Sequence, residues 1–209
     1  MDLASRLDTV TQRAIAEDRI VGAVTVVARD GEVVYRKAHG WLDREAGTPM
    51  PPEAIFRLAS VTKPLIAATA LAMVERGLLG LDNAVHDHLP WFQPRLPDGR
   101  APKIAIRHLL THTSGLGYDF RGDPEITGGI QATNLSLEEN FGLYAERIPL
   151  LFEPGTAWNY GISIDILGAV VATIHGGTLD DALQHYIGRP LGMADTGCAV
   201  TDRARLATA

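Results

Sequence analysis

Cysteine, lysine and serine are scarce in this chain. Among its 209 residues there is one cysteine, Cys198, with only three lysines and five serines. A single cysteine excludes an internal disulfide and fits a reducing compartment. We therefore expect a protein of the cytoplasm.

The chain also lacks an excess of positive charge and a long apolar stretch. Its 19 Lys and Arg residues are outnumbered by 25 Asp and Glu, for a formal net charge of -6. An acidic surface without a basic cluster repels phosphate backbones, which argues against nucleic-acid binding. No apolar run is long enough to span a bilayer, and the first 19 residues have charges throughout instead of the apolar segment of a secretory signal. The sequence therefore predicts neither a nucleic acid nor a membrane as partner.

The predicted elements run from a helix through a hairpin to a long helical region. Apolar residues at helical spacing predict a helix over residues 2–18. Two β-rich runs joined by Asp30-Gly31 predict a hairpin over residues 21–38, because this pair favours a tight two-residue turn. Residues 81–103, including His86-Asp87-His88, read as a solvated loop, and residues 117–134 fit no pattern. Further helices are predicted from Ser60 to Gly77 or Gly80 and over residues 106–112, 135–148 and 162–177. A last one begins at residue 179 and is ended by Gly188-Arg189-Pro190. This order indicates an α+β fold.

One pair of these scarce residues stands at the start of a helix. Ser60 and Lys63 form a Ser-x-x-Lys box, which so few serines and lysines would produce by chance only about 0.07 times in a chain of this length. Residues three apart on a helix share a face, so the Lys63 amine can reach the Ser60 hydroxyl. At a helix N-terminus, free N–H groups favour a developing negative charge. These features predict Ser60 as a nucleophile.

Lysine is the basic residue that such a site requires. Arginine keeps its proton in proteins, whereas a desolvated lysine amine can lose its proton near neutral pH. Lys63 leads into a helix that is apolar on nearly every side, which is typical of a helix buried in a larger body. We therefore interpret Lys63 as a candidate proton acceptor for Ser60.

Three segments carry a resemblance to a known superfamily. FRLASVTKPLIAATALAMVERGLLGLDNAV, IRHLLTHTSGLG and FEPGTAWNYGISIDILGAVV resemble the class C β-lactamase and penicillin-binding-protein superfamily, in particular its carboxylesterase branch, the family VIII esterases. The resemblance implies an antiparallel sheet flanked by helices with an all-helical subdomain, and an acyl-enzyme on Ser60. It also implies that Tyr160 hydrogen-bonds the nucleophile and the lysine and relays the proton. A small carboxylic ester is the expected substrate, and no cofactor or metal is expected.

Two departures from the superfamily pattern bear on the substrate. The β-lactamase pattern has an asparagine two positions after the tyrosine, where this chain has Ile162, which cannot hydrogen-bond a lactam amide. The third box of the superfamily is not found, and His175-Gly176-Gly177, which imitates it, reads as a turn. The first departure favours esters over β-lactams. We expect Trp158, Ile162 and Tyr118 to contact the substrate.

The chain is expected to be an incomplete single domain. Residues 1–59 would supply the first helix and strands, and residues 60–209 a mainly helical region with the active site. A lone hairpin is marginal in water, and two very apolar helices would need a sheet to cover them. Residues 201–209 are polar and show no closing helix or strand. We therefore expect the C-terminal strands of the sheet to come from a missing segment or a companion polypeptide.

Other candidate sites are weaker. His108 and His112 are four apart, a spacing that could hold a metal, but no third ligand is evident. Ser114 and Ser163 lack the flanking glycines of an α/β-hydrolase elbow. Trp41 and Trp91 could line an acyl pocket, although a lone tryptophan usually serves packing. A β-lactamase, a D-amino-peptide hydrolase and a catalytically silent binding module on the same scaffold remain as alternatives.

Overall fold

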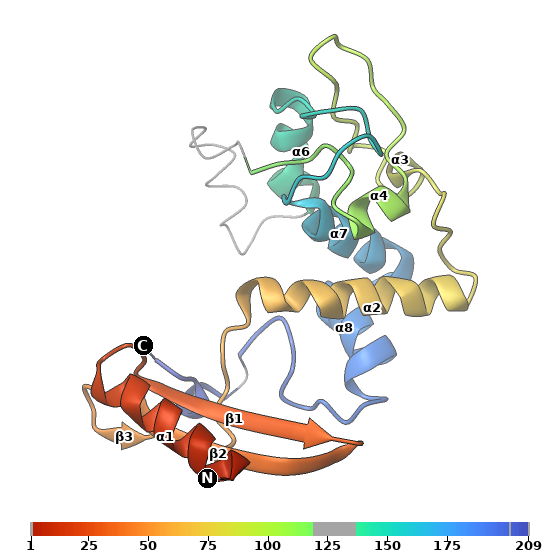
Figure 1. The fold of residues 1–209 in the computed structure, drawn as a ribbon. Coiled ribbons are helices and arrows are strands. Elements are labelled where there is room, and N and C mark those ends of the chain that lie inside the picture. Colours follow the sequence, from red (N-terminus) through yellow and green to blue (C-terminus); the bar gives the residue numbers. More distant parts are fainter. Residues whose placement is uncertain (1, 119–136, 201, 209) are drawn as a thin grey trace. The chain divides into compact units, whose positions relative to one another are not determined.

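The chain folds into two compact units. A computed structural model describes residues 2–118, 137–200 and 202–208 (Figure 1). One unit comprises residues 1–59 with 199–209, and the other residues 60–198. The division therefore falls immediately before Ser60, whereas the last eleven residues belong with the first unit and not with the helical region.

The first unit contains the predicted helix and hairpin. Its elements are α1 (Leu3–Ala16), β1 (Gly22–Arg29), β2 (Glu32–Asp43) and β3 (Thr48–Pro49), in an antiparallel sheet of order β1-β2-β3. Asp30 and Gly31 both have positive φ, 54° and 83°, as a type I′ hairpin turn requires. The prediction of a helix followed by a tight hairpin is confirmed.

Helix α1 lies against β2 (Figure 1). Its Asp8 carboxylate accepts hydrogen bonds from the Tyr35 hydroxyl at 2.6 Å and the Lys37 amine at 2.8 Å, and lies 3.0 Å from Nε2 of His39. All three partners come from β2 at alternate positions, so they project from one face of the strand. A single carboxylate thus joins the helix to the sheet.

The end of the chain has more structure than expected. Residues Arg203–Arg205 form the 3₁₀ helix η4, and Leu206 makes a parallel bridge with Ile55. The backbone N–H of Thr208 then donates to the Leu42 carbonyl at 3.0 Å. The expectation that residues 201–209 contain no helix or strand is corrected: these polar residues form backbone hydrogen bonds within the first unit.

In the described part of the second unit, helices are joined by irregular segments. Its helices are α2 (Thr62–Glu75), α3 (Val85–His88), α4 (Ile106–Leu110), α6 (Leu137–Arg147), α7 (Ser163–His175) and α8 (Leu179–Leu183), which continues as the π-helical turn η3 (Gln184–Gly188). The predicted helices are present. The loop predicted over 81–103 is corrected at α3, where His86-Asp87-His88 is helical. Most of the unassigned segment 117–134 lies outside the described residues.

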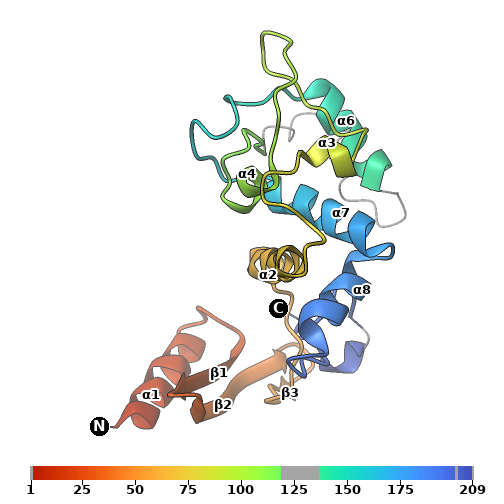
Figure 2. The ribbon, with the colours of Figure 1, turned by 90° about the vertical axis from the view of Figure 1, so that its right-hand side faces the viewer.

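Helix α7 is the centre of this unit. Nearly all its residues from Ser163 to Ala172 are buried, and α2, α3, α4 and α8 pack against it. Figure 2, which views α2 end-on, shows α7 between α2 and α6. The predicted burial of α7 is confirmed. The expectation that a sheet must cover it is wrong, because neighbouring helices bury its apolar side chains.

Helix α2 is buried on one face within the described residues. Ile66, Thr69, Ala70 and Met73 are buried at helical spacing, whereas Leu71 is 49% exposed. The expectation of burial is therefore confirmed for this one face. Throughout the described ranges, every helix is too short or too polar to cross a lipid bilayer.

The contacts of Asp8 with Tyr35, Lys37 and His39 should make the stability of the chain fall at acid pH. Hydrogen bonds from Lys37 and Tyr35 lower the pKa of Asp8 from 3.8 to about 2. The folded state therefore binds a proton less readily than the unfolded state. The stabilisation should be present above about pH 4 and be lost as the pH falls towards 2. We expect Asp8→Asn to lower the melting temperature at neutral pH and to reduce its change between pH 4 and pH 2.

The matched control is Glu32→Gln, since Glu32 is an exposed acid at the start of β2. Its melting curve should follow that of the unmodified chain across the same pH range. If Asp8→Asn melted like this control at every pH, the cluster would contribute nothing measurable to stability.

Candidate active site

Ser60 lies directly ahead of α2. It belongs to the 3₁₀ turn η1 (Ala59–Val61), and the α-helix begins at Thr62. The preceding residue, Ala59, has φ of 47°, in the left-handed region that residues with a side chain rarely adopt. The side chain of Ser60 is exposed. The local backbone thus presents the hydroxyl at the start of a helix, where N–H groups lack helical partners.

Two side chains converge on the Ser60 hydroxyl. The Tyr160 phenol donates a hydrogen bond to Oγ at 2.8 Å, and the Lys63 amine donates a longer one at 3.4 Å. The Lys63 nitrogen also lies 5.2 Å from the centroid of the Tyr160 ring. The structure therefore brings together the three residues that the sequence predicts as catalytic.

Tyr160 is held by contacts between two loop segments, residues 112–118 and 159–163. The Asn159 N–H donates to the His112 carbonyl at 2.9 Å, and the Asn159 side-chain amide contacts the Leu116 carbonyl at 3.4 Å. Gly161 packs so closely on Leu116 that a Cβ atom would collide with that carbonyl. These contacts fix the backbone on both sides of Tyr160.

A buried pair of hydroxyls joins the same segments. The Oγ atoms of Ser114 and Ser163 lie 2.8 Å apart, and both residues are fully buried. Ser114 Oγ also accepts the Leu116 N–H at 3.2 Å. Each hydroxyl thus satisfies the other, as buried polar groups require. These serines connect the loops, and neither is placed to act as a nucleophile.

Aromatic rings surround the Tyr160 side chain. The ring centroid of His112 lies 4.8 Å from that of Tyr160 at an interplanar angle of 37°, and that of Tyr118 lies 5.8 Å away. Trp158 is 6.3 Å from His112 in an edge contact. The phenol is therefore bordered by rings, while 40% of the Tyr160 residue stays exposed.

The site favours a charged lysine. Burial lowers the pKa of the Lys63 amine, but its hydrogen bond with Tyr160, the charge of Asp165 and its interaction with Tyr118 outweigh burial and raise the pKa. The direction of this shift favours the ammonium form, and the role of Lys63 as proton acceptor stays a prediction.

The two tyrosines next to Lys63 shift in opposite directions. Hydrogen bonds with Ser60 and Lys63 lower the pKa of Tyr160 below 10. Burial and the charge of Asp165 raise the pKa of Tyr118. Tyr160 is therefore the more acidic phenol, and it is the one in contact with the serine. The arrangement suits Tyr160 as the proton acceptor and Lys63 as the cation that stabilises the phenolate.

The residues expected to contact the substrate have different positions. Trp158 is 66% exposed beside the cluster, and Tyr118 lies against Tyr160 and Lys63. Ile162 is only 2% exposed and packs in the core with α7. The expectation that its side chain contacts the substrate is therefore corrected: Ile162 anchors the backbone after Tyr160. Of the other tryptophans, Trp91 packs edge-on against Phe92 at 5.8 Å.

The two histidines at metal-like spacing do not face each other as ligands. Nδ1 of His108 accepts the Ala105 N–H at 3.3 Å, while His112 lies beyond the end of α4 and packs on Tyr160. Within the described ranges, no group of three or more His, Cys, Asp or Glu side chains forms a possible metal site. Their spacing reflects a helix that ends between them.

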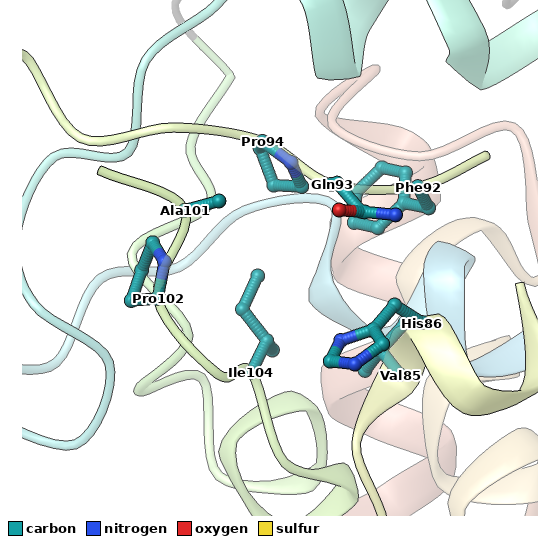
Figure 3. A pocket seen from close by; sticks show the side chains of 8 residues that line it. All are labelled: Val85, His86, Phe92, Gln93, Pro94, Ala101, Pro102 and Ile104. Atoms are coloured by element: carbon teal, nitrogen blue, oxygen red, sulfur yellow. The ribbon is translucent and has the colours of Figure 1, made fainter. Parts of the chain in front are cut away.

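A separate small pocket lies beside α3 (Figure 3). Its volume is about 50 Å³, and it shares no residue with the Ser60 cluster. A water needs at least about 10–15 Å³ of such space, so the pocket holds a few waters at most. The lining residues are Val85, His86, Phe92, Gln93, Pro94, Ala101, Pro102 and Ile104. It is too small for an ester substrate.

Sequence reasoning missed two residues of the site. Asp165, in the first turn of α7, acts on Lys63 and Tyr118 through its charge. Its signal was present, since it is the one charged residue between Ile162 and Ile174. His112 was considered only as a metal ligand, and nothing in its spacing indicated a contact with a residue 48 positions away.

Ser60 and Lys63 lie at the start of α2, and the phenol of Tyr160 contacts Ser60 from another segment. In an α+β chain, this arrangement is that of a candidate serine hydrolase. The chain belongs to the beta-lactamase family, whose model matches residues 7–209. This confirms the resemblance inferred from the Ser60, His112 and Tyr160 segments, and with it the α+β, β-lactamase-like fold class.

The proteins similar to this chain include two esterases and a hydrolase with acyltransferase activity. Esterase EstB of Burkholderia gladioli is 47% identical, in a match covering 98% of this chain and 54% of EstB. The structure of EstCE1, a hydrolase with promiscuous acyltransferase activity, is 45% identical with a TM-score of 0.92, covering 98% of this chain and 55% of EstCE1. Lovastatin esterase of Penicillium rubens is 36% identical over 91% of this chain and 52% of its own length. This chain thus spans about half the length of these relatives.

Proposed function

We propose that this chain is part of a serine hydrolase that cleaves small carboxylic esters through an acyl-enzyme on Ser60. The observation that carries the proposal is the 2.8 Å hydrogen bond between Tyr160 and Ser60, next to the charged Lys63. The similarity to EstB, EstCE1 and lovastatin esterase supports an ester as the substrate.

In the proposed acylation step, Ser60 Oγ attacks the ester carbonyl carbon and its proton passes to the Tyr160 phenolate. The carbonyl oxygen becomes an oxyanion, which N–H groups at the start of α2 are suited to stabilise. When the intermediate collapses, Tyr160 returns the proton to the leaving alcohol and the acyl group stays on Ser60. Lys63 remains charged throughout and stabilises the phenolate.

In the proposed deacylation step, water replaces the alcohol. Tyr160 accepts a proton from the attacking water, and the second tetrahedral intermediate releases the carboxylic acid as the proton passes to Ser60 Oγ. The same phenol serves both half-reactions because it contacts the oxygen that must gain or lose a proton. No redox or metal chemistry enters these steps.

Labelling and mutation of the cluster test this function. A fluorophosphonate should modify Ser60, and Tyr160→Phe should lower kcat for an ester by about 10²–10⁴-fold, because it removes the proton acceptor. Since the phenolate is the active form, kcat/KM should rise with pH up to an apparent pKa below 10. Lys63→Met should move this rise to higher pH. The measurements are adduct mapping by mass spectrometry and pH–rate profiles.

Ser5→Ala provides the matched control, because Ser5 is an exposed serine of α1 outside the Ser60 cluster. An adduct on Ser114 or Ser163, or none at all, would reject Ser60 as the nucleophile. Near-normal turnover by Tyr160→Phe would remove Tyr160 from the mechanism. Labelling that failed entirely would favour the alternative of a silent binding module.

The environment of Ile162 predicts a preference for esters over β-lactams. Its side chain is apolar and buried, so this position offers no donor for a lactam amide. We expect kcat/KM for a short-chain p-nitrophenyl ester to exceed that for nitrocefin. A higher value for nitrocefin would promote the β-lactamase alternative, and release of D-amino acids from peptides would promote the D-amino-peptide hydrolase.

We further propose that polypeptide outside residues 1–209, either a further segment or a companion chain, completes the sheet and the site. The coverage of about half of each relative supports this, as does the position of β1 at an edge of the sheet formed by the described strands. If a second oxyanion donor is supplied from there, residues 1–209 alone should hydrolyse esters about 10²–10³-fold more slowly than a form that includes that polypeptide. Equal turnover by the two forms would contradict the proposal.

We also propose a cytoplasmic location, which rests on the single cysteine and the reducing compartment that it fits.

A further inference from the structure

His112 contacts the proposed base without touching the nucleophile. Its ring lies 4.8 Å from the Tyr160 ring, tilted by 37°, and within the described ranges it makes no hydrogen bond to Tyr160 or Ser60. The contact is therefore made through the ring faces. Tyr160 is 40% exposed, so few other groups fix the orientation of its ring. The contact with His112 adds one.

The backbone holds His112 in a sparsely populated conformation. Its φ is 56°, in the left-handed region, which residues with a side chain adopt only where their surroundings hold them. The carbonyl of His112 accepts the Asn159 N–H at 2.9 Å, and Trp158 packs on its edge. The imidazole is thus fastened to the segment that carries Tyr160, by both its backbone and its ring.

The surroundings of the imidazole favour its neutral form. Burial and the charge of Lys63 lower the pKa of His112. Nδ1 is buried and has no hydrogen-bond partner among the residues described. A second proton there would be a buried N–H without an acceptor, so the neutral ring carries its proton on Nε2. His112 therefore adds a ring surface to the site and leaves Lys63 as the cation beside the phenol.

On the basis of the proposed function, we propose that His112 is a positioning residue for ester cleavage, whose ring face holds the phenol of Tyr160 within hydrogen-bonding distance of Ser60. The charged and titratable groups that face this phenol are Lys63 from α2, Asp165 from α7 and Tyr118. They set its charge, whereas His112 sets its orientation. A role that depends on the ring face does not need the imidazole nitrogens.

Two variants distinguish the contribution of the His112 ring face from that of its nitrogens. His112→Asn tolerates the positive φ but removes the ring, whereas His112→Phe keeps a ring and removes both nitrogens. For a p-nitrophenyl ester, we expect the Asn variant to lose up to about 10²-fold in kcat with little change in KM, because a misplaced catalytic group slows the chemical step. Its rise in kcat/KM should move to higher pH, since the phenol loses the hydrogen bonds that lower its pKa. The Phe variant should retain most of kcat and the original pH profile.

The controls are His86→Asn and Ser60→Ala. His86 is an exposed histidine of α3 outside the Ser60 cluster, so its variant should behave like the unmodified chain. Rates are expressed per serine titrated by prolonged fluorophosphonate labelling, so that a smaller folded fraction does not imitate slower chemistry. His112→Gln is the second ringless variant if the Asn variant does not fold.

The outcomes distinguish this proposal from the function on which it rests. Ester hydrolysis that survives in Ser60→Ala rejects the proposed function, whatever the His112 variants do. If Ser60 is required, a ringless variant with unchanged kcat and pH profile overturns the role of His112, even if it melts at a lower temperature. A Phe variant that melts like the unmodified chain and is still as slow as the Asn variant also overturns it, because the nitrogens and not the ring face would then be required.

Discussion

The hydrogen bond between Tyr160 and Ser60 joins residues 100 positions apart, and the arrangement of the site depends on it. Lys63 reaches Ser60 through helical spacing alone, whereas Tyr160 requires the fold. Segments 112–118 and 159–163 must pack side by side, which Gly161 permits by lacking a Cβ atom and the buried serine pair stabilises. The local pattern thus places a cation beside the proposed nucleophile, and tertiary structure adds the proposed proton acceptor.

The protonation of the site depends on the groups that surround the Lys63 amine. A desolvated lysine would lose its proton more easily, but two phenols and the carboxylate of Asp165 favour the ammonium form. The same cation lowers the pKa of Tyr160, which also hydrogen-bonds Ser60, while burial and Asp165 raise the pKa of Tyr118. The two tyrosines therefore differ in pKa because they lie differently relative to Ser60, Lys63 and Asp165. In the proposed mechanism, the base is the Tyr160 phenolate, and no neutral lysine is needed.

The parts that the sequence predicted correctly are those set by local chemistry. The Asp30-Gly31 turn, the helix starting after Ser60 and the reach of Lys63 depend on neighbours in the chain. The parts that it missed depend on packing. Ile162 seemed available to a substrate until the structure showed it in the core, and His112 appeared as a helix residue although α4 ends before it. Tyr160 was found only because its flanking segment resembled a known superfamily; its residue type alone would have indicated a packed aromatic.

Stability and chemistry share the same residues at the start of α7. Ile162, Ser163 and Ile164 are buried beside Tyr160, so the core fixes the backbone from which the phenol projects. Buried helices pack at high density, and a change of even one methylene shifts their neighbours. The phenol, in contrast, is exposed and tolerates motion unless its ring is held. The core therefore places the Tyr160 backbone, and the exposed ring depends on Lys63, Tyr118 and His112 for its orientation. Precision at the serine arises from both, because on a fixed backbone a change in the Tyr160 χ1 angle would still lose the 2.8 Å contact.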